Sequence, residues 1–344
     1  MQWKVVTPFT RSRSRSGWIM DFIPSEQHNF DFIPANYTHD RSRKASSVMD
    51  WLDYFTHAIR AWFSACITGK NVGFITAFPQ LPIILGLLKR TFHSKRPLVA
   101  WLFNMGRVYG GVKGSIARFA LSGVDIFVVH STEEINTYSS WLRLPRERFV
   151  FVPLSIELRN ATAEEDINHP FILAMGSANR DYRLFVEAAK ILDYQTIIVA
   201  GDHALEGINL PENVRVMSEL SLEKCHELCQ MATVNVIPVD NMTTASGQVT
   251  LLETMMYSKA VIATECVGTL DYITNGVNGI LIPPKDIDAM TSAIKKLWEE
   301  KALRQEIGRA SRRYIEDNIT FKAVSKSMSS LLDDLERNSI NLLS

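Results

Sequence analysis

A short polar turn opens an apolar helix at residues 245–257. Ser246, Gly247 and Gln248 form this turn, and a glycine lets a ligand approach the backbone closely. The N-terminus of a helix carries free backbone N–H groups and the positive end of the helix dipole, so it favours a phosphate. The sequence therefore predicts that these three residues bind a phosphate-containing ligand.

Glu253 lies in the same helix, between Leu252 and Thr254. A carboxylate in an otherwise apolar helix is costly unless a partner donates hydrogen bonds to it. Ribose hydroxyls would be such partners, and we predict that Glu253 binds a ribose. The alternative is that a glutamate early in the helix only favours the helix dipole.

A second turn, Gly-Ser-Ala-Asn-Arg at 176–180, follows a strand expected at 171–175. A strand-to-helix turn at the carboxyl edge of a parallel sheet is the usual ligand position in α/β proteins. Arg180 offers a positive charge there for a phosphate. The alternative is a surface ion pair between Arg180 and Asp181 or Glu187.

The stretch from Ala245 to Asp286 resembles the C-terminal half of retaining glycosyltransferases of family four, which have the GT-B fold. The family pattern has two glutamates eight positions apart, around a glycine-rich turn. Glu253 matches the second glutamate, and Ala245 stands at the position of the first. The resemblance implies that Glu253 contacts the ribose of a nucleotide-diphosphate sugar.

The same resemblance covers the turn at 176–180. In the family an arginine follows the glycine of this turn and a lysine comes a few residues later. Here Ser177 stands at the arginine position and Arg180 at the lysine position, with Arg183 as a substitute for the missing cation. The resemblance implies that Arg180 and Glu253 are catalytic. It implies that the donor binds Gly176, Ser177, Arg180, Ser246, Gly247, Gln248 and Glu253.

Three polar residues in the first half of the chain follow or end expected strands: Gln80, Asn104 and His130. Asn104 stands about where the family often has a histidine. We expect these residues to contact the acceptor. For His130, which ends a buried strand, a structural role is the alternative.

Strand-like apolar runs alternate with helical patterns along the chain, which predicts parallel sheets covered by helices. The first series has strands at 4–7, 71–77, 97–103, 124–130 and 148–152, and helices near 48–65, 80–91, 114–122 and 131–142. The second has strands at 171–175, 196–200, 213–216, 233–237, 260–263 and 279–282, and helices near 181–193, 221–230, 248–257 and 286–299.

The polar stretch 157–170 separates the two series. We predict an α/β protein of the GT-B fold, with two Rossmann-like doubly wound domains facing a central cleft. The acceptor-binding domain would span 1–155 and the nucleotide-sugar-binding domain 156–317. A C-terminal helix, about 318–344, would cross back to the first domain, as the resemblance implies.

Residues 9–47 show no clear periodicity, so we expect an irregular loop there, either functional or disordered. The resemblance implies that this loop faces the cleft and contacts the acceptor. The following helix, 48–66, places large apolar residues on one stripe: Trp51, Phe55, Ala58, Ile59 and Trp62. Packing in the core explains this stripe. The alternative is docking on a bilayer surface.

The formal net charge is zero, so no global field attracts the chain to nucleic acid. Basic residues gather in three clusters: Arg11, Arg13 and Arg15; Arg41, Arg43 and Lys44; Lys89, Arg90, Lys95 and Arg96. Solvated loops explain these clusters. The alternative is a surface that contacts anionic lipid or a lipid-linked pyrophosphate.

The four cysteines are scattered and form no disulfide framework, which suits a reducing cytoplasm. Cys225, His226 and Cys229 share one segment without a second pair at zinc spacing, so we interpret them as ordinary helix residues. The sequence shows no signal-peptide pattern and no apolar run long enough to span a membrane. We expect a cytoplasmic protein, or one peripheral at the inner membrane face.

The resemblance implies a retaining glycosyltransferase that moves a sugar from a nucleotide-diphosphate sugar, with UDP favoured over GDP, to a glycan or lipid-linked glycan. It implies surface polysaccharide synthesis, no cofactor and no metal. The alternative is a catalytically silent nucleotide-sugar-binding partner of an active transferase, which the absent first glutamate favours. A sugar epimerase of the same fold would need a paired acid and base, and no suitable carboxylate pair is present.

Overall fold

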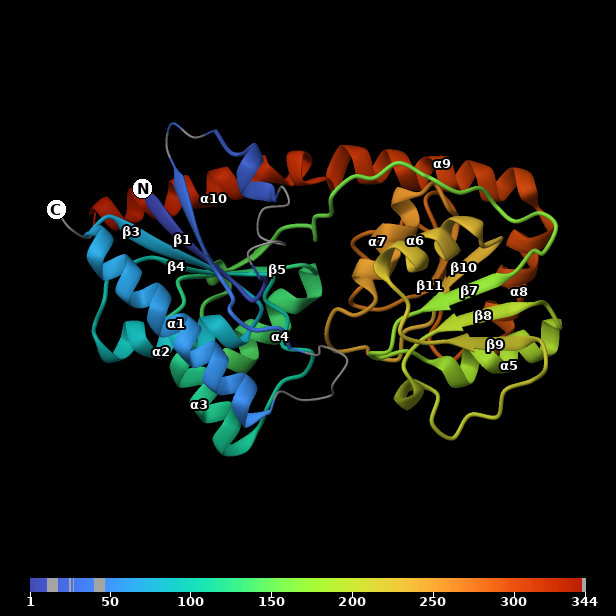
Figure 1. Cartoon of the computed structure of the whole chain (residues 1–344), viewed down its shortest axis with the longest axis horizontal. Helices are drawn as coiled ribbons and strands as arrows, with labels where there is room; N and C mark the ends of the chain where they lie inside the picture. The colour runs from blue at the N-terminus through green and yellow to red at the C-terminus, as the bar shows by residue number, and fades with distance from the viewer. Residues whose placement is uncertain (11–17, 25, 27, 40–46, 342–344) are drawn as a thin grey trace. The chain divides into compact units, whose positions relative to one another are not determined.

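The computed structural model describes residues 1–10, 18–24, 26, 28–39 and 47–341. The chain divides into two compact units (Figure 1). Unit 1 comprises residues 1–157 together with 321–344, and unit 2 comprises residues 158–320. The basic clusters at 11–15 and 41–44 lie outside the described residues. Within the described ranges, no helix combines the length and the apolarity that a membrane span requires.

Unit 1 is built on a parallel sheet of order β2-β1-β3-β4-β5-β6. Its strands are β1 (Gln2–Thr7), β2 (Asn29–Pro34), β3 (Val72–Ala77), β4 (Leu98–Trp101), β5 (Ile126–Val129) and β6 (Phe149–Phe151). Its helices are η1 (Ile19–Phe22), α1 (Val48–Thr68), α2 (Gln80–Thr91), α3 (Gly111–Leu121), α4 (Thr132–Leu142), η2 (Arg146–Arg148) and α10 (Phe321–Asn341).

The two faces of this sheet form two separate cores, because neighbouring strand residues point to opposite sides. Val6 packs with residues of α1, α2, α3 and α4. Val5 packs on the other side with η1 and α10. The buried strands are apolar along their whole length, as is typical of a parallel sheet covered on both faces.

The prediction that residues 9–47 form only an irregular loop is wrong. Asn29–Pro34 forms β2, which pairs in parallel with β1 at the edge of the sheet. An edge strand has only one neighbour and stays partly exposed, so it lacks the continuous apolar run that marks the inner strands.

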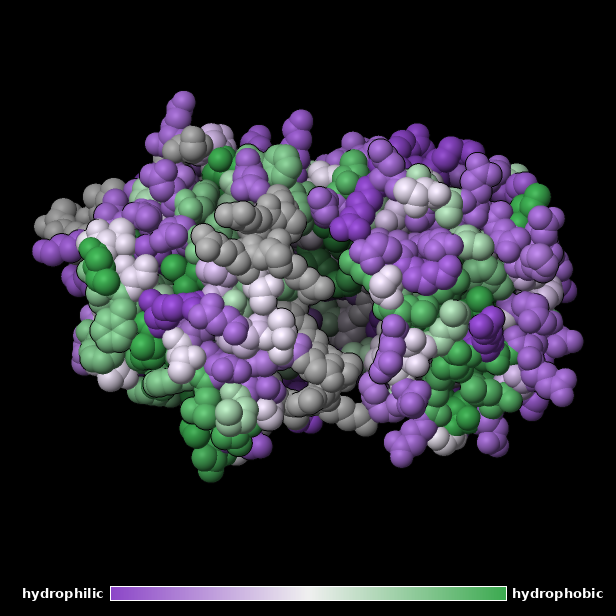
Figure 2. Space-filling model, in the orientation of Figure 1, coloured by the Kyte–Doolittle hydropathy of each residue, from purple (hydrophilic) through white to green (hydrophobic). Residues whose placement is uncertain are grey.

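Helix α1 begins at a capping box, in which Ser47 Oγ accepts from the Asp50 backbone N–H and the Asp50 carboxylate accepts from the Ser47 N–H. Ala58 and Trp62 are buried as predicted, but Trp51 and Phe55 are 38% and 47% exposed. The predicted stripe is therefore only partly a core face. Hydrophobic side chains also reach the surface where α3 lies (Figure 2).

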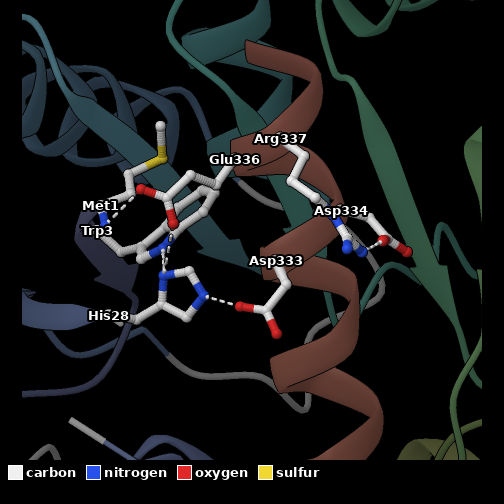
Figure 3. A network of polar contacts seen from close by, with 7 residues as sticks. All are labelled: Met1, Trp3, His28, Asp333, Asp334, Glu336 and Arg337. Carbon is white, nitrogen blue, oxygen red and sulfur yellow. Dashed lines mark hydrogen bonds and ion pairs between the residues drawn. The ribbon is translucent and has the colours of Figure 1, made fainter. Parts of the chain in front are cut away.

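Helix α10 joins unit 1 through apolar packing and a polar network (Figure 3). The Trp3 indole donates to His28 Nδ1 at 3.1 Å, and His28 Nε2 lies 2.9 Å from Asp333 Oδ1. An indole N–H can only donate, so Nδ1 accepts and Nε2 carries the proton that bonds Asp333. This arrangement fixes α10 against the start of the chain.

Unit 2 has a second parallel sheet, of order β12-β11-β10-β7-β8-β9. Its strands are β7 (Ile172–Met175), β8 (Thr196–Val199), β9 (Val214–Met217), β10 (Val234–Ile237), β11 (Val261–Thr264) and β12 (Ile280–Ile282). Its helices are α5 (Tyr182–Leu192), η3 (Asp202–Ala204), α6 (Leu222–Met231), α7 (Gln248–Met256), α8 (Ile287–Glu299) and α9 (Lys301–Asn318). The predicted α/β class with two doubly wound sheets is confirmed.

Candidate functional site

The strand order of unit 2 reverses between β7 and β10, and this switch point is where open α/β sheets bind ligands. The turns that follow these two strands are hydrogen-bonded to each other. The Asp181 N–H donates to Pro238 O at 2.8 Å, and the Asp240 N–H donates to Asn179 O at 3.0 Å. The structure thus brings together the two turns that the sequence singled out.

Arg180 folds back over the end of β7. Its Nε donates to Met175 O at 3.1 Å and its Nη1 to Ala178 O at 2.8 Å. Its Nη2 lies 3.3 Å from the Thr250 hydroxyl, which belongs to α7. The guanidinium therefore sits between the two turns, against the first turn of α7.

Burial of the Arg180 guanidinium lowers its pKa from the usual value, although the group stays charged at neutral pH. Tyr182 and Cys266 are the groups beside it that favour the charge, and both are neutral at pH 7. Among the described residues, no carboxylate pairs with Arg180. A buried cation without an anion is costly, so this position favours an anionic ligand.

Arg183, the expected substitute cation, does not join the site. It is exposed on α5 and its Nη2 lies 3.4 Å from Gly207 O. Arg180 also does not form the alternative ion pair with Asp181 or Glu187. Asp181 instead caps α5 and bonds Lys285 Nζ at 2.8 Å.

Two glycines make room for this arrangement. Gly176 has a φ of 110°, and a Cβ there would lie 2.6 Å from Arg180 Nη2. Gly247 has a φ of 82° and begins α7, where a Cβ would lie 3.0 Å from Ile237 Cγ2 and Val239 Cγ2. Both positions have left-handed backbone that a side chain would strain.

Ser246 is held in place by two amides. Its Oγ accepts from Asn179 Nδ2 at 3.0 Å and from Asn241 Nδ2 at 3.2 Å. Gly268, from the loop after β11, packs so closely that a Cβ there would lie 2.1 Å from Ser246 O. The sequence did not predict a role for Gly268, because no local pattern indicates that the loop of Gly268 contacts the turn at Ser246.

The first backbone N–H groups of α7 follow the turn at Gly247, which is the N-cap residue of the helix. Gly247 supplies no side-chain oxygen to cap them. Gln248, the first helical residue, is buried rather than open at the surface. Thr250, one turn into the helix, was not among the predicted site residues, although it is the side chain of α7 that Arg180 reaches.

Glu253 lies on the next turn of α7, where its side chain is partly buried. Its Oε1 is 3.3 Å from His226 Nε2 on α6, and His226 Nδ1 is 3.0 Å from the Tyr257 hydroxyl. A histidine nitrogen of the protein therefore lies close to the Glu253 carboxylate, but the two groups do not form a hydrogen bond of normal geometry. His226 was interpreted as an ordinary helix residue, so its contact with Glu253 was missed.

Ser177 connects the ends of two strands. Its hydroxyl accepts from the Gly201 N–H, beyond β8, at 2.8 Å. A hydroxyl that accepts one bond still has a proton to donate. Ser177 therefore has a structural contact in addition to its predicted place at the donor site.

The three predicted acceptor residues of unit 1 follow β3, β4 and β5, which are neighbours in the sheet. Gln80 lines a cavity of about 400 Å³. Asn104 Oδ1 accepts from the Gly106 N–H at 2.7 Å. His130 is buried with Nδ1 2.7 Å from Val152 O, and burial lowers its pKa to about 4, so its ring is neutral at pH 7.

The family model of "Glycosyl transferases group 1" matches residues 169–300. The O-antigen chain mannosyltransferase C of Escherichia coli is 27% identical over 218 residues, which cover 58% of this chain and 58% of that protein. The D-rhamnosyltransferase WbpZ of Pseudomonas aeruginosa is 28% identical over 219 residues, which cover 58% and 56%. The match thus spans little more than half the length of these relatives.

Solved structures extend the likeness in fold to the whole chain. Sucrose-phosphate synthase from Thermosynechococcus elongatus superposes with a TM-score of 0.72 at 14% identity, over 97% of this chain and 99% of that one. HepE of Anabaena, crystallised with UDP, gives a TM-score of 0.67 at 12% identity, over 97% and 100%. Residues 169–300 are thus similar in sequence to the group 1 glycosyl transferases, and the chain has the architecture of the GT-B fold.

Proposed function

We propose that the protein is a retaining glycosyltransferase, which moves a sugar from a nucleotide-diphosphate sugar to a hydroxyl of a glycan or lipid-linked glycan. The observation that carries this proposal is the partly buried guanidinium of Arg180 at the switch point of unit 2, which has no carboxylate partner among the described residues. A diphosphate supplies the missing negative charge. The N-terminus of α7 beside it supplies backbone donors to the same group.

Glu253 is proposed to bind the ribose. Its Oε1 faces His226, and a carboxylate has acceptor sites for several further hydrogen bonds. Two adjacent ribose hydroxyls would fill these sites. His226, held by Tyr257, would fix the orientation of the carboxylate.

In the proposed reaction, the bond between the anomeric carbon and the diphosphate oxygen breaks as the acceptor oxygen bonds to the same face of that carbon. The acceptor proton passes to the leaving phosphate oxygen, so no enzymic base is needed. Arg180 and the N-terminus of α7 would stabilise the charge that develops on the diphosphate. We propose that Gln80 and Asn104 position the acceptor. The buried ring of His130 would support the chain behind them.

The donor nucleotide is proposed to be UDP, with GDP as the alternative. HepE, which shares the fold, was crystallised with UDP. A mannosyltransferase and a rhamnosyltransferase are among the relatives, and the name of the first refers to the O-antigen chain. We therefore propose a hexose or deoxyhexose as the transferred sugar and surface polysaccharide as the product.

One observation favours a second candidate function. Ala245, at the position of the family's first glutamate, is buried and carries no polar side-chain atom. A protein that binds a nucleotide sugar without transferring it would tolerate this loss. Turnover measurements separate this silent partner from the active transferase.

The test combines nucleotide titration with turnover. We expect UDP or GDP to bind the wild-type protein, and Arg180→Gln and Glu253→Gln each to weaken binding by about 10- to 150-fold, the equivalent of about 1.5–3 kcal/mol for a charge-assisted hydrogen bond. Arg183→Gln is the matched control, because Arg183 is exposed on the neighbouring helix, and it should stay within about twofold of wild type.

Turnover is measured as nucleotide released from a panel of UDP and GDP sugars, with and without a chelator. We expect release that resists the chelator and a product whose anomeric configuration matches the donor by NMR. Binding without release across the panel indicates the silent partner. Unchanged nucleotide binding in Arg180→Gln and Glu253→Gln overturns the proposed site.

A further inference from the structure

Helices α1 and α3 each expose apolar side chains on the side opposite their core face. On α1 these are Val48, Met49, Leu52, Phe55, Phe63 and Ile67. On α3 they are Val112, Ile116 and Phe119, at the spacing of one helix face. A surface helix of a globular protein normally presents polar residues to water. Figure 2 shows hydrophobic side chains gathered where Figure 1 draws α3.

The helices that carry these residues lie on one side of unit 1, because α1, α2 and α3 cover the same face of the sheet and pack side by side. We call the outer side of these three helices the α1–α3 face. A cavity of about 400 Å³ opens on it, lined by Trp51, Gln80, Arg107, Tyr109, Lys113 and Ile116 among others. Apolar and cationic side chains thus share this surface.

Most charged residues of the α1–α3 face are basic, although the first turns of α1 also carry Asp50 and Asp53. Residues 54–124, which include most of α1 and all of α2 and α3, carry nine Lys and Arg residues and no Asp or Glu. Arg107 and Lys113 are exposed at the cavity. The Arg90 guanidinium lies 4.7 Å from the centre of the Phe119 ring, so a cation and an exposed aromatic ring meet at the end of α3.

Two residues of the third basic cluster, which comprises Lys89, Arg90, Lys95 and Arg96, are engaged within the protein. Lys89 bonds the Asp125 carboxylate, and Arg96 Nη2 donates to Gly69 O at 3.0 Å. The cations that remain exposed are accompanied by the apolar residues of α1 and α3. The surface is therefore better described by its apolar side chains and predominantly basic charge together than by that cluster alone.

We propose that the α1–α3 face docks on an anionic lipid bilayer. A bilayer accepts scattered aliphatic and aromatic side chains without a matching shape, and anionic headgroups attract the surrounding lysines and arginines. A nucleic acid would pair with the cations but would leave Val112, Ile116 and Phe119 in water. This inference goes beyond the proposed transferase activity and does not depend on it.

The test is co-sedimentation with phosphatidylcholine vesicles that contain or lack phosphatidylglycerol. We expect the protein to bind the anionic vesicles, with binding that weakens as salt is raised. Ile116→Glu should reduce the partition coefficient by about tenfold or more, because it places a charge where an apolar side chain meets the bilayer. Lys113→Glu should reduce it by about fivefold or more.

Unit 2 offers a matched control for each variant. Ile191 on α5 is 59% exposed, against 60% for Ile116, and Lys190 beside it is also exposed. Ile191→Glu and Lys190→Glu should bind vesicles as wild type does. Nucleotide titration of the same samples should show all four variants unchanged, which separates this inference from the proposed donor site.

Three results would overturn the proposal. The first is no vesicle binding, or equal binding to neutral and anionic vesicles. The second is equal binding by wild type and Ile116→Glu. The third is concentration-dependent self-association that Ile116→Glu abolishes while vesicles are not bound, which would assign the face to a second copy of the chain.

Discussion

Arg180, which is partly buried, differs from the buried Arg304 of unit 2 in the groups that surround its charge. Arg304 Nη2 lies 2.7 Å from the Glu165 carboxylate and its Nη1 bonds two helix-end carbonyls. Arg180 bonds two carbonyls and a hydroxyl only, among the residues that the structure describes. The fold thus pairs Arg304 with a carboxylate and gives Arg180 no such partner among the described residues, as the proposed donor site requires.

A second residue-scale consequence concerns acid stability. Burial lowers the pKa of His130 to about 4, and the hydrogen bond to Val152 O offsets this only in part. The unfolded histidine titrates near pH 6.5. Between these values the unfolded chain binds a proton that the folded chain does not, so stability falls as the pH drops from about 6.5 to about 4, by up to roughly 3 kcal/mol.

Urea unfolding at pH 7 and pH 5 measures this effect. His130→Gln can still donate to Val152 O but does not titrate, so the loss of stability between the two pH values should be smaller than in wild type by about 1–2 kcal/mol. Burial lowers the pKa of His57 to about 4 as well, so part of the pH dependence should remain. Exposed His93→Gln is the control. An unchanged pH dependence in His130→Gln contradicts the prediction.

Some site residues could be predicted from the sequence and others could not. Arg180 lies in the turn after the strand-like run 171–175, and Ser246 and Gly247 open an apolar helix, so both turns were evident. His226 and Gly268 reach the site only through packing between elements. Glu253 meets His226 because α6 and α7 pack together, and Gly268 meets Ser246 because a loop folds over the turn. Single-sequence patterns carry no information on such contacts.

At the scale of elements, the turn before α7 packs against the loop after β11, which contains Gly268. The sequence alone does not predict this contact. A Cβ on Gly268 would lie 2.1 Å from Ser246 O and 2.6 Å from Ser246 N, and backbone atoms cannot move aside as a flexible side chain would. We expect Gly268→Ala to lower the free energy of unfolding by about 1–3 kcal/mol. It should also weaken nucleotide binding, because it displaces the turn.

Thermal unfolding and nucleotide titration of Gly268→Ala test this prediction. Gly110→Ala is the matched control, because Gly110 has a φ of −95° and a Cβ added there would meet no heavy atom of the described residues within 4 Å. It should be as stable as wild type. If Gly268→Ala also matches wild type in both measurements, the loop does not hold the turn.

The sequence predicted every strand of the two sheets except the edge strand β2. Inner strands such as β3 and β7 are short, fully buried apolar runs, which are visible without any tertiary information. Strand β2 is half-exposed and was missed. On α1 the periodicity was evident, but Trp51 and Phe55 are exposed while Tyr54 and Ala61 are buried. A helix with two apolar faces does not reveal by periodicity which of them packs on the sheet.

At the scale of the whole molecule, the net charge of zero conceals an uneven distribution. The acid-free stretch 54–124 contains most of α1 and all of α2 and α3, whose outer sides belong to the same side of unit 1. This signal was present in the sequence. Its meaning depended on the fold, since only the sheet topology shows that these helices share one face.

The division of the chain into two compact units leads to a prediction about the folding and nucleotide binding of unit 2 alone. Unit 2 has its own apolar core, and α10 packs in the core of unit 1 rather than that of unit 2. The described contacts of Arg180, Ser246 and Glu253 all lie within residues 158–320. We therefore expect a fragment of residues 158–320 to fold alone and to bind the nucleoside diphosphate with an affinity close to that of the full chain.

This fragment should not transfer sugar, because Gln80 and Asn104, the proposed acceptor contacts, belong to unit 1. Circular dichroism and nucleotide titration of the fragment, beside the same fragment with Arg180→Gln, provide the measurement. The Arg180→Gln fragment should be equally folded and should bind about 10- to 150-fold more weakly. A folded wild-type fragment that binds no nucleotide would mean that the donor site needs residues of unit 1, because the charge of Arg180 alone would then be insufficient to hold the diphosphate.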